Sequence, residues 1–246
     1  MTKERSFEDL LREMVHRTGE NLTKEQTQQF VRYAELLRRW NEKMNLTAIV
    51  DDEGIAVKHI LDSLMLLPLM DDLAEKCDSS PCLIDVGSGA GLPGIPLVIM
   101  RPEWRGVLLD SMAKRIRFLD EVILSLELTT LKAKQDRAED AGHDPCLREQ
   151  FDLVVARAVA SLPVLAEYCL PFAKVGGLFV AMKGRADSEW PQAERAVTLL
   201  GGQLEKLKTF QLPGTDQTRS LFCIRKIKPT SQKYPRKAGK PEKQPL

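Results

Sequence analysis

The chain contains few cysteines and histidines, and this scarcity excludes several kinds of site. Its five cysteines are an odd number, and none of them are spaced as CxxC. A disulfide framework or a cysteine-based zinc site would need closer, paired spacing. The three histidines (His16, His59 and His143) are too scattered to form a metal site with one another. We therefore expect reduced, mostly packed thiols and no bound metal.

Long apolar runs are also missing. The longest uninterrupted run, Leu64–Met70, contains Pro68 and is far shorter than the roughly 20 residues that cross a bilayer. The N-terminal stretch MTKERSFEDLLREM is charged and has no apolar signal core. These absences predict a soluble, cytoplasmic protein with no membrane partner.

The composition is that of a globular protein, but its charge is unevenly distributed. The 246 residues are 43% hydrophobic and 29% charged, which suits one large domain with an appended lobe. The net charge is +1, yet residues 225–246 hold eight basic residues and one acidic residue. This segment carries +7, so the remainder carries −6. The asymmetry favours an anionic partner for the C-terminal end; a solvated, disordered tail is the alternative.

The first part of the chain has a helical pattern. Apolar residues recur every three or four positions between Phe30 and Met44, and Thr23 with Gln26 forms a capping-box pattern that would begin this helix. A second helical pattern covers 55–70. Since no strand is evident before residue 82, we expect an N-terminal helical lobe over 1–78.

From residue 79 to residue 228, short apolar runs alternate with segments of helix length. This alternation predicts an α/β fold with a mostly parallel, Rossmann-like sheet. The last two strands are joined only by a turn at Leu212–Gly214, which predicts an antiparallel hairpin at one edge. A basic tail, 229–246, follows. The expected strands are 82–86, 107–110, 131–135, 151–156, 178–182, 203–210 and 220–227, and the expected helices are 94–101, 112–127, 161–172 and 188–200.

The strongest local signal is a glycine-rich loop after the first strand, in LIDVGSGAGLPG, 83–94. Strand, glycine cluster and helix in this order place a nucleotide-like ligand at the carboxyl ends of the strands. Gly89, Gly91 and Gly94 match G-x-G-x-x-G, so an NAD-type site is an alternative. The frame that starts at Asp85 and continues through Gly87, Gly89 and Gly91 fits better. An acid at the strand end suits a cationic ligand, and S-adenosyl-L-methionine carries an ammonium and a sulfonium group.

Polar residues follow the next strands as well. Asp110 closes the second expected strand, where a carboxylate can accept both ribose hydroxyls of either cofactor class. Glu139 follows the third strand, where an adenine ring would lie, and Arg157 follows the fourth. The carboxyl ends of parallel strands share one edge, so we expect these side chains to meet in one crevice.

The chain resembles the bacterial 16S ribosomal RNA guanine-N7 methyltransferases, also called glucose-inhibited division protein B. The resemblance runs nearly from end to end, and its ordered set of motifs is highly specific. It rests on RWN (39–41), NLT (45–47), HILDSL (59–64), DVGSGAGLPGIP (85–96), LDSMAKR (109–115), RAE (137–139), ARAVA (156–160), LPF (170–172), KG (183–184), LPGT (212–215) and KYPRKAGKP (233–241). Leu92 stands where the family often has an aromatic residue.

The resemblance implies a class I methyltransferase fold. It also implies transfer of a methyl group from S-adenosyl-L-methionine to N7 of a guanine, conventionally numbered 527, in 16S rRNA of the small ribosomal subunit. The family's cofactor contacts correspond to Gly87, Leu92, Asp110, Ala138, Glu139 and Arg157. With the loop residues Asp85, Gly89 and Gly91, they are the cofactor-binding residues that we expect.

Guanine N7 has a free lone pair, so we expect no catalytic general base. His59, Asp62 and Ser63 lie within one helical turn and cannot form a catalytic relay by themselves. We expect Arg157 to hold the cofactor carboxylate or an RNA phosphate. We expect RNA phosphates to be bound by basic residues near or in the tail, namely Arg219, Lys233, Arg236, Lys237 and Lys240.

Three alternatives stay open at this stage: a methyltransferase for a small molecule or another RNA, an NAD-dependent dehydrogenase, and a non-catalytic RNA-binding module. The basic tail disfavours a small-molecule substrate. Intact Gly87, Gly89 and Asp110 disfavour a vestigial crevice. We expect the protein to be a monomer.

Overall fold

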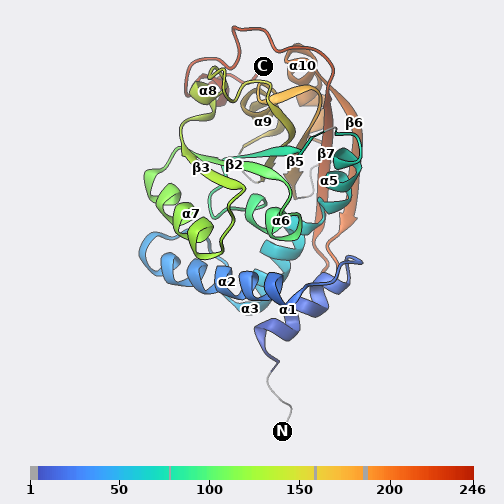
Figure 1. The fold of residues 1–246 in the computed structure, drawn as a ribbon. Helices are drawn as coiled ribbons and strands as arrows, with labels where there is room; N and C mark the ends of the chain where they lie inside the picture. Colours follow the sequence, from blue (N-terminus) through green and yellow to red (C-terminus); the bar gives the residue numbers. More distant parts are fainter. Residues whose placement is uncertain (1–4, 78, 158–159, 185–187) are drawn as a thin grey trace.

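A computed structural model describes residues 5–77, 79–157, 160–184 and 188–246. Its centre is a seven-stranded sheet with the order β3-β2-β1-β4-β5-β7-β6 (Figure 1). The strands are β1 (Cys82–Val86), β2 (Arg105–Asp110), β3 (Leu131–Gln135), β4 (Phe151–Arg157), β5 (Ala173–Lys183), β6 (Gly202–Gln211) and β7 (Thr218–Lys226).

The strand directions explain where a ligand can bind. Strands β1 to β5 are parallel, whereas β7 pairs antiparallel with β5 and with the edge strand β6. The strand order reverses between β1 and β4, which are neighbours in the sheet. Connections from β1 and from β4 leave in opposite directions there, and this opens a crevice at the carboxyl ends. The α/β class, the parallel sheet and the antiparallel edge hairpin are confirmed.

Helices cover both faces of the sheet. Alternate residues of β1 point to opposite faces: Leu83 packs in the core with α6 and α7, and Ile84 packs in the core with α9 and α10. Figure 1 shows these two helical layers on either side of the sheet. The helices of the two layers are α6 (Gly94–Met100), α7 (Ala113–Ser125), α8 (Ala138–Ala141), α9 (Leu162–Cys169) and α10 (Trp190–Leu199).

The N-terminal helices extend the layer that contains α6 and α7. Helix α1 spans Phe7–His16, and α2 (Lys24–Met44) begins with the expected capping box of Thr23 and Gln26. Several α2 side chains bond to the rest of the chain: among them, the Gln26 amide donates to the Ile99 carbonyl of α6 at 3.1 Å, and the buried Tyr33 hydroxyl donates to the Ala90 carbonyl at 2.7 Å. The second bond connects α2 to the glycine loop.

The second helical pattern folds as a series of short turns. They are α3 (Asp52–Gly54), the π-helix η1 (Ile55–Leu61), α4 (Asp62–Leu64) and α5 (Leu67–Ala74). A helical prediction for 55–70 is therefore confirmed in type, but the first half is a wider π-helix. Such π-helical turns are frequent at functional sites, and η1 contains His59. None of the helices in the described part of the chain is long and apolar enough to span a bilayer.

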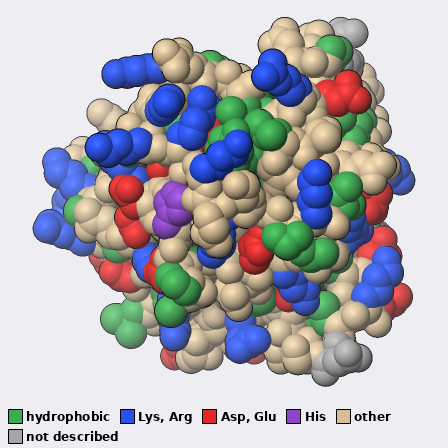
Figure 2. All heavy atoms as spheres, turned by 90° about the horizontal axis from the view of Figure 1, so that it is seen from above, with side chains coloured by type: hydrophobic (Ala, Val, Ile, Leu, Met, Phe, Trp, Pro, Cys, Tyr) green, Lys and Arg blue, Asp and Glu red, His purple; other side chains and the backbone are tan. Residues whose placement is uncertain are grey.

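The segment after β7 returns across the top of the molecule in Figure 1 and includes the short helix α11 (Lys240–Lys243). Figure 2 views this end from above, and Lys and Arg side chains gather toward the left of that face.

Candidate cofactor-binding site

A cavity of about 480 Å³ lies at the carboxyl ends of β1 to β4. This volume is in the range of small-molecule sites. Its lining comes from the loops after these strands, from η1 and from the C-terminal segment. The lining residues are Leu46, Thr47, His59, Val86, Gly87, Ser88, Gly89, Ala90, Leu92, Leu109, Asp110, Ser111, Arg115, Asp136, Arg137, Ala138, Glu139, Arg157, Tyr168, Gly239 and Glu242.

The glycine loop has a backbone that other residues rarely adopt. Gly87, Gly89 and Gly91 have φ angles of 72°, 59° and 84°, in the left-handed region that glycine enters without steric cost. Among the described residues, a Cβ on Gly89 would have only the Gly87 carbonyl oxygen within 4 Å, at 3.8 Å. The space above Gly89 is therefore open to a ligand that approaches the backbone.

Asp85 supports this loop from beneath. Its side chain is fully buried, and one carboxylate oxygen accepts the Gly94 N–H at 2.9 Å and the Ser88 hydroxyl at 3.0 Å. The other oxygen has no hydrogen-bond partner among the described residues. Burial raises the pKa of Asp85 to about 6, against the lowering effect of the Gly94 N–H.

Seven of the nine expected cofactor residues line the cavity. Among the described residues, the other two, Asp85 and Gly91, do not line the cavity. Gly91 is packed against Ile95, since a Cβ at Gly91 would lie 2.2 Å from the Ile95 Cδ1. These two residues shape the loop, and a direct contact from either one to a cofactor stays a prediction.

Asp110 is placed at the end of β2 and connects two loops. Its Oδ2 accepts the Gly89 N–H at 3.0 Å and the Arg115 guanidinium at 3.2 Å, and its Oδ1 accepts the Met112 N–H at 2.9 Å. A carboxylate has about four lone-pair sites, so Oδ1 keeps one acceptor position for a ligand hydroxyl.

The far end of the cavity lies at α8 and α9. Ala138 and Glu139 of α8 line it together with Tyr168 of α9. The carboxylate of Glu139 is buried and accepts the Gly239 N–H at 2.9 Å. The C-terminal segment therefore touches the residue that sequence analysis assigns to the adenine ring.

Arg157, at the end of β4, also lines the cavity and belongs to a partly buried charge cluster. Its guanidinium donates to the Lys58 carbonyl at 3.1 Å and to Asp62 at 3.5 Å. Asp62 also accepts from the Nε of Arg219 at 3.0 and 3.1 Å. Residues 158–159 of the motif that follows Arg157 lie outside the described residues.

The model of the GidB family, whose description is rRNA small subunit methyltransferase G, matches residues 26–221. The matched stretch begins in α2, covers the glycine loop and most of the cavity lining, and ends in β7. The chain belongs to this family. The resemblance read from the sequence motifs is confirmed.

Individual relatives match over nearly the whole chain. Ribosomal RNA small subunit methyltransferase G from Acetivibrio thermocellus is 49% identical over 244 residues, which is 99% of this chain and 98% of that protein. The protein of the same name from Clostridium novyi is 42% identical, with 100% of both chains covered. The similarity to both therefore includes the C-terminal segment.

Solved structures show the same fold at low identity. The 16S rRNA (adenine(1408)-N(1))-methyltransferase from Catenulisporales acidiphilia has a TM-score of 0.53 at 16% identity and covers 65% of this chain and 93% of its own. A geranyl diphosphate methyltransferase has a TM-score of 0.50 at 12% identity, with coverages of 67% and 85%. Such likeness shows the class I methyltransferase fold, as expected from the sequence.

The side chains that suggest a catalytic relay have structural contacts in this family member. The Ser63 hydroxyl donates to the His59 carbonyl at 2.6 Å, and Asp62 faces Arg157 and Arg219. The His59 Nε2 lies 3.0 Å from the Thr47 hydroxyl. Each of the three side chains thus has a structural partner, and the expectation that they form no relay stays a prediction.

The five residues expected to bind RNA have two kinds of surroundings. Arg219 is paired with Asp62, and the Arg236 guanidinium is paired with the buried Glu167. Lys233, Lys237 and Lys240 are exposed. RNA contacts by these five stay a prediction, and the three lysines are the ones whose charge faces solvent.

Sequence analysis missed several lining residues, including Thr47, Arg115, Tyr168, Gly239 and Glu242. Thr47 and Arg115 stand inside quoted motifs, so their positions carried a signal. Gly239 also stands inside a quoted motif, KYPRKAGKP (233–241). Tyr168 lies within an apolar helix and Glu242 directly follows that motif, and neither carries a local signal for a ligand site.

Burial gives His59 a pH-dependent effect on stability. Desolvation, with a contribution from the nearby Arg157 charge, lowers the pKa of His59 from 6.5 to about 4. Between pH 4 and pH 6.5 the His59 imidazole binds a proton more readily in the unfolded chain than in the folded one. The stability contributed by His59 is therefore fully present above about pH 6.5 and is lost as the pH falls toward 4. From pH 7 to pH 5 we expect the free energy of unfolding to drop by about 2 kcal/mol more in the wild type than in His59→Gln. Urea unfolding at both pH values measures this, and equal drops would contradict it.

Proposed function

We propose that this protein transfers a methyl group from S-adenosyl-L-methionine to N7 of a guanine in 16S rRNA of the small ribosomal subunit, acting as a cytoplasmic monomer. The observation that carries the proposal is the family match over residues 26–221, which contain most of the cavity lining. The names of the relatives supply the substrate class, and the cavity supplies a place for the cofactor.

The residues present fit this cofactor. The open backbone at Gly89 allows close approach of a ligand, and Asp110 keeps one acceptor position for a ribose hydroxyl. Arg157 would hold the cofactor's carboxylate at one end, while Ala138 and Glu139 would contact the adenine at the other. The acid at the end of β1, Asp85, suits a cationic ligand better than the pyrophosphate of NAD. When bound, S-adenosyl-L-methionine supplies a methyl group on a positively charged sulfur.

Catalysis would depend on positioning. Guanine N7 presents a lone pair without loss of a proton, so the side chains have no proton to remove. Alignment of acceptor and donor can lower a barrier by roughly 7–11 kcal/mol. The reaction leaves a positive charge on the purine, and Asp62 partly neutralises Arg157 nearby. This pairing reduces the repulsion that a free arginine would exert on the product.

The RNA would be held by charge at the face shown in Figure 2. Lys233, Lys237 and Lys240 of the C-terminal segment are exposed and can contact phosphates. The guanine would have to be unstacked, as in an RNA loop, to reach the cavity.

The proposal is tested by transfer of labelled methyl to small ribosomal subunits that lack the modification, followed by mapping of the labelled base. We expect label at one guanine N7, and none on subunits that already carry the methyl group. Naked 16S rRNA and small-molecule extracts serve as parallel acceptors. Label on another atom, or only on a small molecule, would overturn the assignment of the substrate.

A further inference from the structure

The C-terminal segment, residues 230–243, is held against the molecule by a series of buried polar contacts. Lys226 begins the series: its buried ammonium donates to the Leu170 carbonyl and to the Thr230 hydroxyl, both at 2.6 Å. The Arg148 guanidinium then donates to the carbonyls of Thr230 and Tyr234, at 2.7 and 2.9 Å. Backbone carbonyls bound by buried cations fix the path of the chain.

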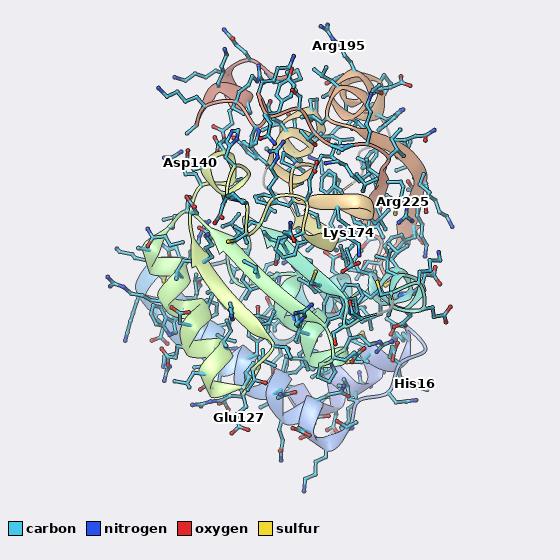
Figure 3. The ribbon with its side chains drawn as sticks, turned by 45° about the horizontal axis from the view of Figure 1, so that its top comes forward. His16, Glu127, Asp140, Lys174, Arg195 and Arg225 are labelled. Carbon is cyan, nitrogen blue, oxygen red and sulfur yellow. The ribbon has the colours of Figure 1, made fainter. Side chains whose placement is uncertain are left out.

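The next contacts direct the segment toward the cavity. His143 donates from Nε2 to the Pro235 carbonyl at 2.8 Å. Arg236 forms a bidentate ion pair with Glu167 of α9. The Glu167 side chain is only 1% exposed. Gly239, with a φ of 77°, then turns the chain so that its N–H reaches the Glu139 carboxylate. In Figure 3 the segment passes over α8, which the labelled Asp140 marks.

As a result, two residues of this segment, Gly239 and Glu242, line the cavity beside Glu139 and Tyr168. Glu242 is the single acidic residue among the eight basic ones of 225–246. Glu242 is exposed, as are Lys237, Lys240 and Lys243 beside it, but of these four residues Glu242 is the one that lines the cavity. Burial and the charges of Glu139 and Glu242 raise the pKa of the Tyr168 phenol. This end of the cavity therefore has two carboxylates around one phenol.

The Tyr168 phenol has one hydrogen to donate, so the two carboxylates around it keep acceptor positions for a hydrogen-bond donor of the ligand. The donors of S-adenosyl-L-methionine are its ammonium group, its ribose hydroxyls and the 6-amino group of adenine. Asp110 at the end of β2 suits a ribose hydroxyl, and Arg157 suits the carboxylate beside the ammonium group. The adenine 6-amino group is the donor that remains for the end at Glu139 and Glu242.

We infer that the C-terminal segment is part of the cofactor site, with Glu242 accepting a hydrogen bond from the adenine 6-amino group and Gly239 holding Glu139 in place. The inference depends on the proposed use of S-adenosyl-L-methionine. It gives the segment a role in cofactor specificity that is separate from any contact of its exposed lysines with RNA.

The test uses the full-length protein and S-adenosylhomocysteine, which binds without reacting. Glu242→Ala is compared with the matched control Lys243→Ala, a change at the adjacent, exposed position. Each is titrated calorimetrically, without RNA, with S-adenosylhomocysteine and with the analogue in which hypoxanthine replaces adenine. Hypoxanthine presents a carbonyl in place of the amino group, and a carboxylate would repel it.

We expect the wild type and Lys243→Ala to bind the adenine compound at least tenfold more tightly than the hypoxanthine compound. Glu242→Ala should bind the adenine compound about tenfold more weakly than the wild type and lose most of this preference. Equal weakening for both compounds, or unchanged affinity, would overturn the role of Glu242. Failure of the wild type to bind S-adenosylhomocysteine would instead overturn the proposed cofactor. Unchanged thermal unfolding of Glu242→Ala confirms that the comparison concerns folded protein.

Discussion

Replacing Asp110 by Ala should lower the affinity for S-adenosylhomocysteine by about 100-fold. A hydrogen bond to a charged group contributes about 1.5–3 kcal/mol, and each 1.4 kcal/mol corresponds to a tenfold change. Asp110 would contribute one such bond from Oδ1, and it also holds the Gly89 N–H through Oδ2. The variant loses the ligand contact and the support of the glycine loop together.

Asp110→Asn should be almost as severe, although it has nearly the same shape. Three donors converge on the Asp110 carboxylate, from Gly89, Met112 and Arg115. An amide has one oxygen, so its NH₂ group must face at least one of these donors and leave it unpaired. Asp120→Asn, the same change at an exposed position of α7, is the control. Affinity within threefold of wild type for Asp110→Asn would show that the carboxylate is not needed.

The sequence is sufficient to predict the sheet and the glycine loop because their signals are local. β1 and β3 begin and end at the residues expected, and α2 begins at the expected capping box. The strands follow from apolar periodicity, and the capping box follows from side chains three residues apart. β5 begins at Ala173, earlier than the expected residue 178. The apolar pattern missed this first part because residues 174–176 are exposed and do not alternate between apolar and polar side chains as a half-buried strand does.

Contacts between distant residues could not be predicted in this way. Asp62 is 157 residues from Arg219 and 95 residues from Arg157, and no spacing rule relates them. The π-helix η1 also depends on how this segment packs. The tail illustrates the same limit: its basic composition suggests a solvated segment, whereas Arg236 and Gly239 connect it to the cavity wall through Glu167 and Glu139. Charge composition predicts that the lysines of the tail are exposed, but it does not predict the buried Arg236–Glu167 and Gly239–Glu139 contacts.

Asp62→Ala should destabilise the protein by about 3 kcal/mol. Asp62 is 4% exposed, and it faces two guanidinium groups whose side chains are only 16% and 18% exposed. Removing one partner of a buried ion pair costs about 3–5 kcal/mol because the remaining charge stays buried, and the partial exposure of Arg157 and Arg219 favours the lower figure. Urea unfolding should show a lower midpoint with an unchanged slope. Asp72→Ala, at an exposed position of α5, should change the free energy of unfolding by less than about 0.5 kcal/mol.

A second substitution separates loss of the pair from loss of packing. In Asp62→Ala/Arg219→Ala, one of the two unpaired cations is gone, so the double variant should be more stable than the sum of the two single effects predicts. Residues in direct contact show such coupling at about 0.5–3 kcal/mol. Strict additivity would mean that Asp62 stabilises the fold through shape alone. Coupling would mean that the charge of Asp62 holds Arg219; the same carboxylate pairs with Arg157, which lines the cavity.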